Sequence, residues 1–140
     1  MTILRTALLT LGIVFLASAS RAQETNVKAD VPFDFVAGDH VYPAGEYTLK
    51  SMLDTDAVIR IDGSPEFPGR NLLSNACTLI TPSKQTKLVF RRVGESYFLY
   101  QVWVAGNLGG REFPRGRAET RLAQNRQDSD LVVVAVAITK

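Results

Sequence analysis

Arginines near the C-terminal end of the chain are the residues whose type and spacing best suit the binding of a charged ligand. Arginine carries planar, paired N–H donors that match carboxylate, sulfate and phosphate groups. The candidate anion-binding residues are Arg111, Arg115, Arg117 and Arg121, with Arg126 following. On a helix Arg117 and Arg121 share one face, and a loop at glycines 109–110 would let an anion approach. The competing interpretation is a solvated helix face whose charge is balanced by Glu112 and Glu119.

Aromatic side chains form a second candidate site. Three of them could stack on sugar rings: Tyr97, Tyr100 and Trp103. On a regular strand Tyr97 and Trp103 point to one face and Tyr100 points to the other, because side chains alternate. The three then share no surface, and packing in the core is the competing interpretation.

Catalytic and metal-binding patterns are weak in this chain. It holds one histidine, His40, in a Gly-Asp-His turn, and one cysteine, Cys77. A Ser-His-Asp triad would depend on His40, and no Gly-x-Ser-x-Gly motif accompanies it. One histidine with one distant cysteine matches no zinc spacing, and Asp54 with Asp56 lacks the remaining ligands of a calcium loop. We therefore predict no catalytic residues, no cofactor and no metal site.

Cys77 lies in an apolar, strand-like segment, residues 75–80. A lone cysteine in such a segment is most often a small buried hydrophobe. An intermolecular disulfide or a reactive thiol is the alternative, but no basic neighbour in the sequence would lower the pKa of this thiol. The buried hydrophobe is the favoured interpretation, and the sequence does not decide whether the thiol is free.

Residues 1–22 have the three-part layout of a secretory signal. One arginine precedes an apolar run at 7–17, and small residues follow it. The small residues predict cleavage between Ala22 and Gln23, with a cut after Ala19 as the alternative. The apolar run is too short to span a membrane, and no other stretch is longer. We predict export to the periplasm or the medium.

The charge and length of the chain limit which classes of function remain. The chain has sixteen Lys and Arg against fourteen Asp and Glu. Two of the basic residues, Arg5 and Arg21, belong to the leader, so the exported part is neutral. A neutral, exported domain is a poor candidate for binding nucleic acid. Residues 23–140 have the length of a single domain with one core.

The mature chain has the pattern of short strands separated by turns. Val31, Phe33 and Phe35 alternate with Pro32, Asp34 and Val36, which predicts a strand with one apolar face. Pro32 lacks an N–H donor, so the start of this strand should lie at a sheet edge.

The clearest hairpin lies between Lys87 and Val104, with Gly94-Glu95 as a two-residue turn. This turn predicts the cross-strand pairs Val93–Ser96, Arg91–Phe98 and Val89–Tyr100. The second strand is apolar on both faces, so we expect it to be central and covered on both sides.

Two further elements follow this hairpin. Pro114 and the pair Arg115 and Glu119 predict one short helix over 115–124. The run at 131–138 is strongly β-prone, and an exposed run of this kind promotes aggregation. We therefore expect it to be central in a sheet or paired with another chain.

The predicted fold is all-β: an antiparallel β-sandwich or small barrel of about 7–8 strands, with one short helix. Three segments carry a resemblance: VPFDFVAGDHVYPAGEYTL at 31–49, KLVFRRVGESYFLYQVWV at 87–104 and GGREFPRGRAETRLA at 109–123. They resemble a family of short exported β-rich proteins that occur in multiple copies in acidobacterial genomes. The resemblance implies a β-rich fold and carries no activity.

The leading functional hypothesis is an exported, non-enzymatic β domain that works by association. Its partner would be a second copy, an envelope or extracellular protein, or an acidic glycan. The second hypothesis is a barrel that binds a small ligand, either lipid or sugar. A small hydrolase is the third.

Overall fold

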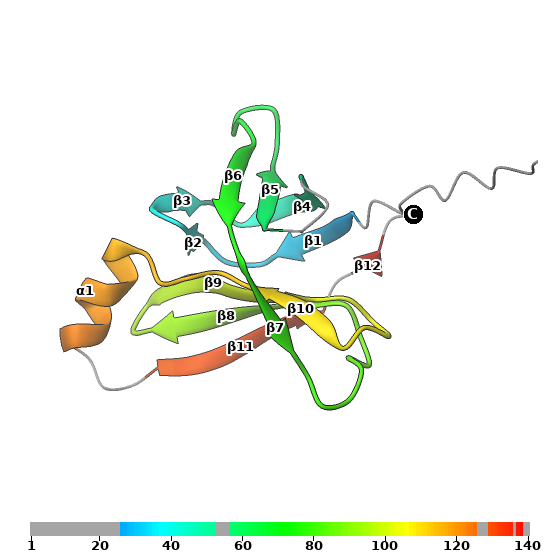
Figure 1. Cartoon of the computed structure of the whole chain (residues 1–140). Coiled ribbons are helices and arrows are strands. Elements are labelled where there is room, and N and C mark those ends of the chain that lie inside the picture. Colours follow the sequence, from blue (N-terminus) through cyan, green and yellow to red (C-terminus); the bar gives the residue numbers. More distant parts are fainter. Residues whose placement is uncertain (1–25, 53–56, 126–128, 136, 139–140) are drawn as a thin grey trace, which may run out of the picture.

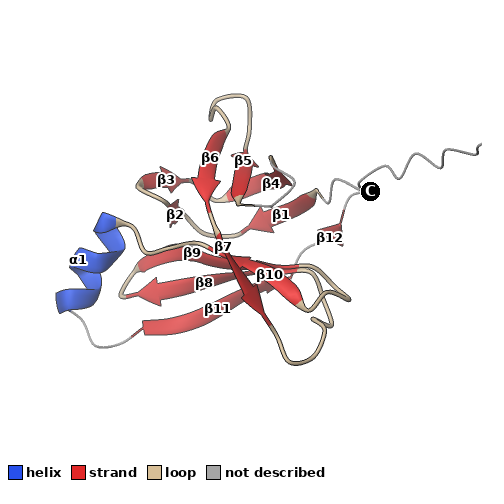
Figure 2. Cartoon of the chain, in the orientation of Figure 1, coloured by secondary structure: helices blue, strands red, loops and turns tan. Residues whose placement is uncertain are grey.

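The computed structural model describes residues 26–52, 57–125, 129–135 and 137–138. They form two β-sheets that face each other as layers, with one short helix at the end of one layer (Figures 1 and 2). The all-β prediction is confirmed, and the two sheets form a sandwich that is not closed into a barrel. Twelve short strands are present in the described residues, because several extended segments bend and pass from one sheet to the other.

The first sheet has the strand order β12-β1-β4-β5-β6. Its strands are β12 (Ala137–Ile138), β1 (Val27–Val31), β4 (Gly45–Ser51), β5 (Val58–Asp62) and β6 (Arg70–Leu73). In β1, buried Val27, Ala29 and Val31 alternate with exposed Lys28 and Asp30. This period of two places one face of the sheet against the core and leaves the other in solvent.

The second sheet has the order β11-β8-β9-β10-β7. Its strands are β11 (Ser129–Ala135), β8 (Lys87–Val93), β9 (Ser96–Trp103), β10 (Gly109–Glu112) and β7 (Asn75–Thr78). Short β2 (Phe35–Ala37) pairs in parallel with β9 and antiparallel with β3 (His40–Tyr42). Helix α1 (Arg117–Asn125) lies at one end of this sheet and contacts β8 (Figure 1).

The predicted strand through Val31, Phe33 and Phe35 is two strands in different sheets. β1 ends at Val31, and β2 begins at Phe35. Pro32 removes an N–H donor at this point, so the ladder of β1 cannot continue through it. β1 lies between β12 and β4, but β12 pairs only with Val27 and Lys28, so in the described residues the end of β1 beside Pro32 pairs with β4 alone.

A single residue, Ser74, separates β6 in the first sheet from β7 in the second. Its N–H donates to the carbonyl of Ala57 at 2.8 Å. Arg111 of β10 braces the same corner: its Nε donates to Ser74 Oγ at 3.0 Å, and its Nη2 donates to the Ser74 carbonyl at 2.8 Å. Buried backbone groups at a bend need such partners. Arg111 therefore stabilises the passage between the sheets.

The hairpin β8–β9 has its predicted turn, and its register is as predicted only near that turn. Gly94 has a φ of 63°, which suits glycine at the first turn position. Val93 pairs with Ser96, and Arg91 pairs with Phe98, but Val89 pairs with Gln101. A β-bulge at Tyr100 inserts one residue into β9, so the predicted Val89–Tyr100 pair is wrong.

The expectation that the second hairpin strand is central is confirmed. β9 lies between β8 and β10, and consecutive Phe98 and Leu99 are both buried. Leu99 belongs to the core between the sheets, whereas Phe98 is buried on the opposite face. The second sheet therefore buries apolar side chains on both faces.

Aromatic rings fill the space between the sheets. Phe35 stands at the centre, with its ring centroid 5.2 Å from Tyr42, 5.1 Å from Tyr47 and 5.4 Å from Phe90. Most of these rings meet edge to face, the geometry favoured by aromatic quadrupoles. The core is thus built from rings that come from both sheets.

Helix α1 begins at Arg117, two residues later than predicted. Its first N–H, on Arg117, donates at 3.2 Å to Asp39 Oδ1 in the turn between β2 and β3. The Gly116 carbonyl accepts from the Thr120 N–H at 3.1 Å. A distant carboxylate therefore caps this helix, and local sequence patterns do not report such a partner.

Candidate functional site

The longest free sheet edge among the described residues belongs to β11. This strand has seven residues and pairs along its whole length with β8 only. The other outer strands are shorter: four residues in β6, four in β7, three in β3 and two in β12. A long outer strand leaves a row of backbone N–H and C=O groups available for another strand.

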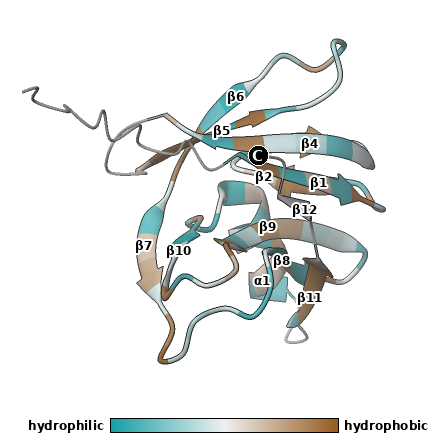
Figure 3. Ribbon diagram, turned by 90° about the vertical axis from the view of Figure 1, so that its right-hand side faces the viewer, coloured by the Kyte–Doolittle hydropathy of each residue, from teal (hydrophilic) through white to brown (hydrophobic). Residues whose placement is uncertain are grey.

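The two faces of β11 differ. Val132 and Val134 are partly buried and pack against the core between the sheets. Leu131 and Val133 lie on the other face and are 62% and 49% exposed. Figure 3 shows β11 as a strongly hydrophobic ribbon at the margin of its sheet. The strand thus offers both unpaired backbone groups and uncovered apolar side chains.

The structure corrects the prediction for the C-terminal run. We expected residues 131–138 to be central in a sheet or paired with another chain, and in the described residues neither part is central. β11 is the outermost strand of the second sheet, and β12 is the outermost strand of the first. The alternative in that prediction, pairing with another chain, is the one compatible with this placement.

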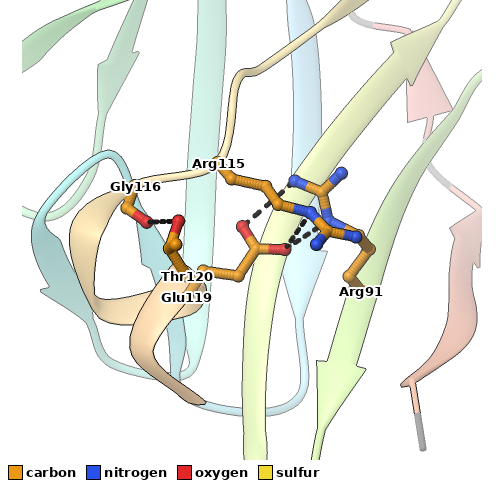
Figure 4. Close-up of polar contacts among 5 residues, drawn as sticks. All are labelled: Arg91, Arg115, Gly116, Glu119 and Thr120. Atoms are coloured by element: carbon orange, nitrogen blue, oxygen red, sulfur yellow. Dashed lines mark hydrogen bonds and ion pairs between the residues drawn. The ribbon is translucent and has the colours of Figure 1, made fainter. Parts of the chain in front are cut away.

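A buried ion pair joins helix α1 to β8. Glu119 is the only buried residue of the helix, and Arg91 is a buried residue of the strand. Arg91 Nη2 donates to Glu119 Oε2 at 3.0 Å, and Arg91 Nε contacts Glu119 Oε1. Arg115 approaches the same carboxylate at 3.7 Å from a more exposed position (Figure 4). The helix therefore docks through a buried charge pair, with half-buried Leu122 and Ala123 beside Glu119 on the same helix face.

Polar contacts continue from this pair across the outer face of the second sheet. The Arg91 guanidinium carbon lies 4.1 Å from the ring centroid of Tyr100, within cation–π range. Burial, and next the Glu112 carboxylate, raise the pKa of Tyr100. Glu112 also accepts from Gln101 Nε2 at 3.0 Å, and Gln101 Oε1 accepts from Trp103 Nε1 at 3.1 Å. These groups hold one another in place.

The arginines predicted to bind an anion have different environments. Arg111 donates hydrogen bonds to Ser74 at the corner between β6 and β7, and Arg115 lies near Glu119. Arg117 and Arg121 are exposed on α1, and no ion pair joins either of them to another described residue. Glycines 109 and 110 belong to β10 instead of a loop. Only Arg117 and Arg121 therefore retain the geometry that the anion hypothesis needs.

The predicted aromatic set is divided by the bulge at Tyr100. Tyr97 packs toward the core, with its ring centroid 3.9 Å from that of Phe33. Trp103 is buried on the opposite face, against Gly110. Tyr97 and Trp103 thus lie on different faces, contrary to expectation, because one extra residue reverses the alternation of side chains.

The histidine and the cysteine lie in separate places. His40 is exposed at the start of β3, where Arg70 Nη1 lies 2.9 Å from its Nε2. Arginine can only donate, so His40 Nε2 is the acceptor in this contact. Cys77 is half-buried in β7, and burial is the main cause that raises the pKa of its thiol. A raised pKa disfavours the reactive thiolate.

Several sequence predictions lie outside the described residues: the leader at 1–22, the pair Asp54 and Asp56, and Arg126. In the described part of the chain, no group of three or more His, Cys, Asp or Glu side chains is arranged to hold a metal ion. None of the described helices has the length and apolar character needed to cross a membrane.

No family model, no curated protein and no solved structure matches this chain. The resemblance to short exported β-rich proteins therefore stays a prediction.

Sequence reasoning missed the role of Arg91 and Glu119. One signal was present: Arg91 pairs with Phe98 in a hairpin whose second strand is apolar on both faces. A charge placed there needs a buried partner of opposite sign. The chain has several carboxylates, and only the packing of α1 shows that Glu119 is the partner.

Proposed function

We propose that this protein is an exported, non-enzymatic β domain that works by association, and that β11 is the strand through which it associates. The single observation that carries this proposal is the outer position of β11 together with exposed Leu131 and Val133. Export rests on the sequence pattern of residues 1–22.

Strand addition is the mode of association that this geometry favours. An added strand forms main-chain hydrogen bonds with the free edge, and apolar side chains on one face supply contact area. Proteins usually keep outer strands short, or protect them with proline, lysine or bulges. β11 contains no proline, lysine or glycine and has one charged residue, Asp130. It has little protection against pairing.

The small-ligand hypothesis receives less support. It requires room inside a barrel or an aromatic face open to solvent. The sheets form a sandwich, and rings such as Phe35, Tyr47 and Phe90 occupy its interior. Tyr97 and Trp103 lie on opposite faces and form no shared platform. Association therefore has the stronger structural basis.

Crosslinking in the native cells tests the proposal. The tagged full chain is compared with Val133→Lys, which places a charge on the exposed face of β11. The matched control is Val41→Lys, because Val41 is also an exposed strand valine, at 69%, and its strand β3 pairs only with β2. We expect crosslinked products from the wild type and the control, and their loss in Val133→Lys. Equal products from all three proteins would contradict the role of β11.

A further inference from the structure

We infer that β11 pairs with β11 of a second copy, antiparallel and about a two-fold axis that passes through Val132. This inference rests on the proposed function and names its partner. Homo-oligomers most often have two-fold symmetry, in which the same surface of each copy meets itself. An outer strand can pair with its own copy in this way when antiparallel pairing brings suitable residues of the two copies opposite each other.

Side-chain alternation restricts the possible registers. Opposite residues in an antiparallel pair point to the same face of the sheet. Exposed Leu131 and Val133 must therefore meet residues on the outer face of the partner. Centring the pair on Val132 places Leu131 opposite Val133 of the second copy and Val133 opposite its Leu131. All seven residues of Ser129–Ala135 then have a partner, and on the order of six main-chain hydrogen bonds form.

The apolar contact in this register is continuous. Leu131 and Val133 from each copy form a patch of four side chains on one face of a joined sheet. These residues are among the exposed large hydrophobic side chains of the described chain. Cross-strand pairs of this kind are the unit of sheet stabilisation. Pairing covers the residues that the isolated domain leaves in water.

Charge also favours this register. Asp130 is the only charged residue of β11, and it comes to lie opposite Val134 of the partner. The two Asp130 side chains are then four residues apart along the strands, roughly 13 Å at strand spacing. Centring the pair on Asp130 would place the two carboxylates directly opposite each other, which is destabilising. With sixteen basic and fourteen acidic residues, the chain also lacks a large net charge that would keep copies apart.

Sedimentation equilibrium of protein purified from expression of the full chain tests the inference. We expect a dimer for the wild type and for Val41→Lys. Val133→Lys places one lysine per copy at the seam and should raise the dimer dissociation constant by roughly tenfold or more. A wild-type monomer at all concentrations, or a dimer that Val133→Lys leaves unchanged, would overturn the inference.

The same variants separate this inference from the proposed function. If the wild type is monomeric but crosslinks to another cell component in a Val133-dependent way, then β11 is an association strand and its partner is not a second copy. If neither dimer nor Val133-dependent crosslink is found, both proposals fail. Circular dichroism of each variant shows whether the substitution leaves the fold intact.

Engineered cysteines test the register. In a Cys77→Ser background, Leu131→Cys and Val133→Cys are purified separately and then oxidised alone or mixed. Residues directly opposite have Cβ atoms about 5 Å apart, whereas the same residue of two copies would be about 7 Å apart or more. We expect the mixture to crosslink faster than either variant alone. Faster crosslinking of either variant alone would overturn the two-fold axis at Val132.

Discussion

Arg91 and Glu119, 28 positions apart in the chain, form a buried ion pair that fixes helix α1 on the second sheet. Glu119 is the only fully buried side chain of the helix, and Leu122 and Ala123 on the same helix face are half-buried. Most surface helices pack through an apolar face. In this protein the packed face of α1 also includes one half of a buried charge pair.

Replacing Glu119 should therefore destabilise the protein strongly. In Glu119→Gln the Arg91 guanidinium stays buried without its counter-charge, which costs about 3 kcal/mol or more. Arg115→Ala is the control, because Arg115 reaches the same carboxylate only at 3.7 Å and from an exposed position, which is worth about 0.5 kcal/mol. Urea unfolding measures both variants. Equal losses in the two would contradict the special role of the Arg91–Glu119 pair.

The two glycines of β10 should respond differently to alanine. A Cβ added to Gly110 would lie 2.4 Å from the Trp103 ring, whereas one added to Gly109 meets nothing within 4 Å. We expect Gly110→Ala to lower the free energy of unfolding by about 1–3 kcal/mol and Gly109→Ala to change it little. Trp103 is the only tryptophan, so its fluorescence should report the displacement in Gly110→Ala alone. Similar spectra and stabilities for both variants would rule out this contact.

Two tyrosines of the core should respond to phenylalanine in opposite ways. The Tyr47 hydroxyl donates to the Pro43 carbonyl, and Tyr47→Phe should cost about 1 kcal/mol. The Tyr42 hydroxyl is buried, and no described residue gives it a hydrogen bond. Tyr42→Phe removes that group and should leave stability unchanged or raise it. Thermal unfolding of the two variants measures both changes in stability. A larger loss of stability in Tyr42→Phe than in Tyr47→Phe would refute the prediction.

Alkaline pH should lower the free energy of unfolding, because Tyr47 is a buried residue of the core. Burial is the main cause that raises the pKa of Tyr47, with smaller contributions from Tyr42 and Asp34. An unfolded tyrosine has a pKa of about 10, so as pH rises the unfolded chain releases its proton before the folded one. The free energy of unfolding should therefore be fully retained below about pH 10 and fall above it. Denaturant unfolding between about pH 9 and pH 11 should show a shallower decline for Tyr47→Phe than for the wild type. Identical declines of stability with pH in Tyr47→Phe and the wild type would contradict the role of Tyr47.

The arginines of the predicted anion site should separate into structural and surface residues. Arg111→Lys loses the paired donors that hold the Ser74 corner and should cost about 1–2 kcal/mol. Arg121→Lys changes an exposed residue and should stay within about 0.5 kcal/mol of the wild type. If Arg121→Lys costs as much as Arg111→Lys in urea unfolding, Arg121 has a structural partner as well.

Local patterns in the sequence predicted the features that depend on neighbouring residues. The turn at Gly94-Glu95 and the first pairs of the β8–β9 hairpin agree with the structure, because glycine and a two-residue loop determine the register beside the turn. The central position of β9 followed from apolar side chains on both of its faces. The late helix is also present, although it begins at Arg117.

Features that depend on contacts between distant residues could not be predicted from local sequence patterns. The bulge at Tyr100 shifts the register between β8 and β9, and it places Tyr97 and Trp103 on opposite faces. The helix start depends on Asp39, 78 positions from Arg117. Arg111 was predicted as a ligand-binding residue and supports a strand corner.

The sequence by itself determined the all-β class, the turns and the strong β-propensity of the C-terminal run, because dihedral preferences and side-chain alternation are local properties. The central position of β9 followed from its sequence, whereas the outer position of β11 depends on the tertiary structure. In the part of the chain that the structure describes, β9 has strands on both sides and β11 pairs with β8 alone. Strand order is the result of packing distant segments into two layers, and no local property of β11 shows that it is an outer strand.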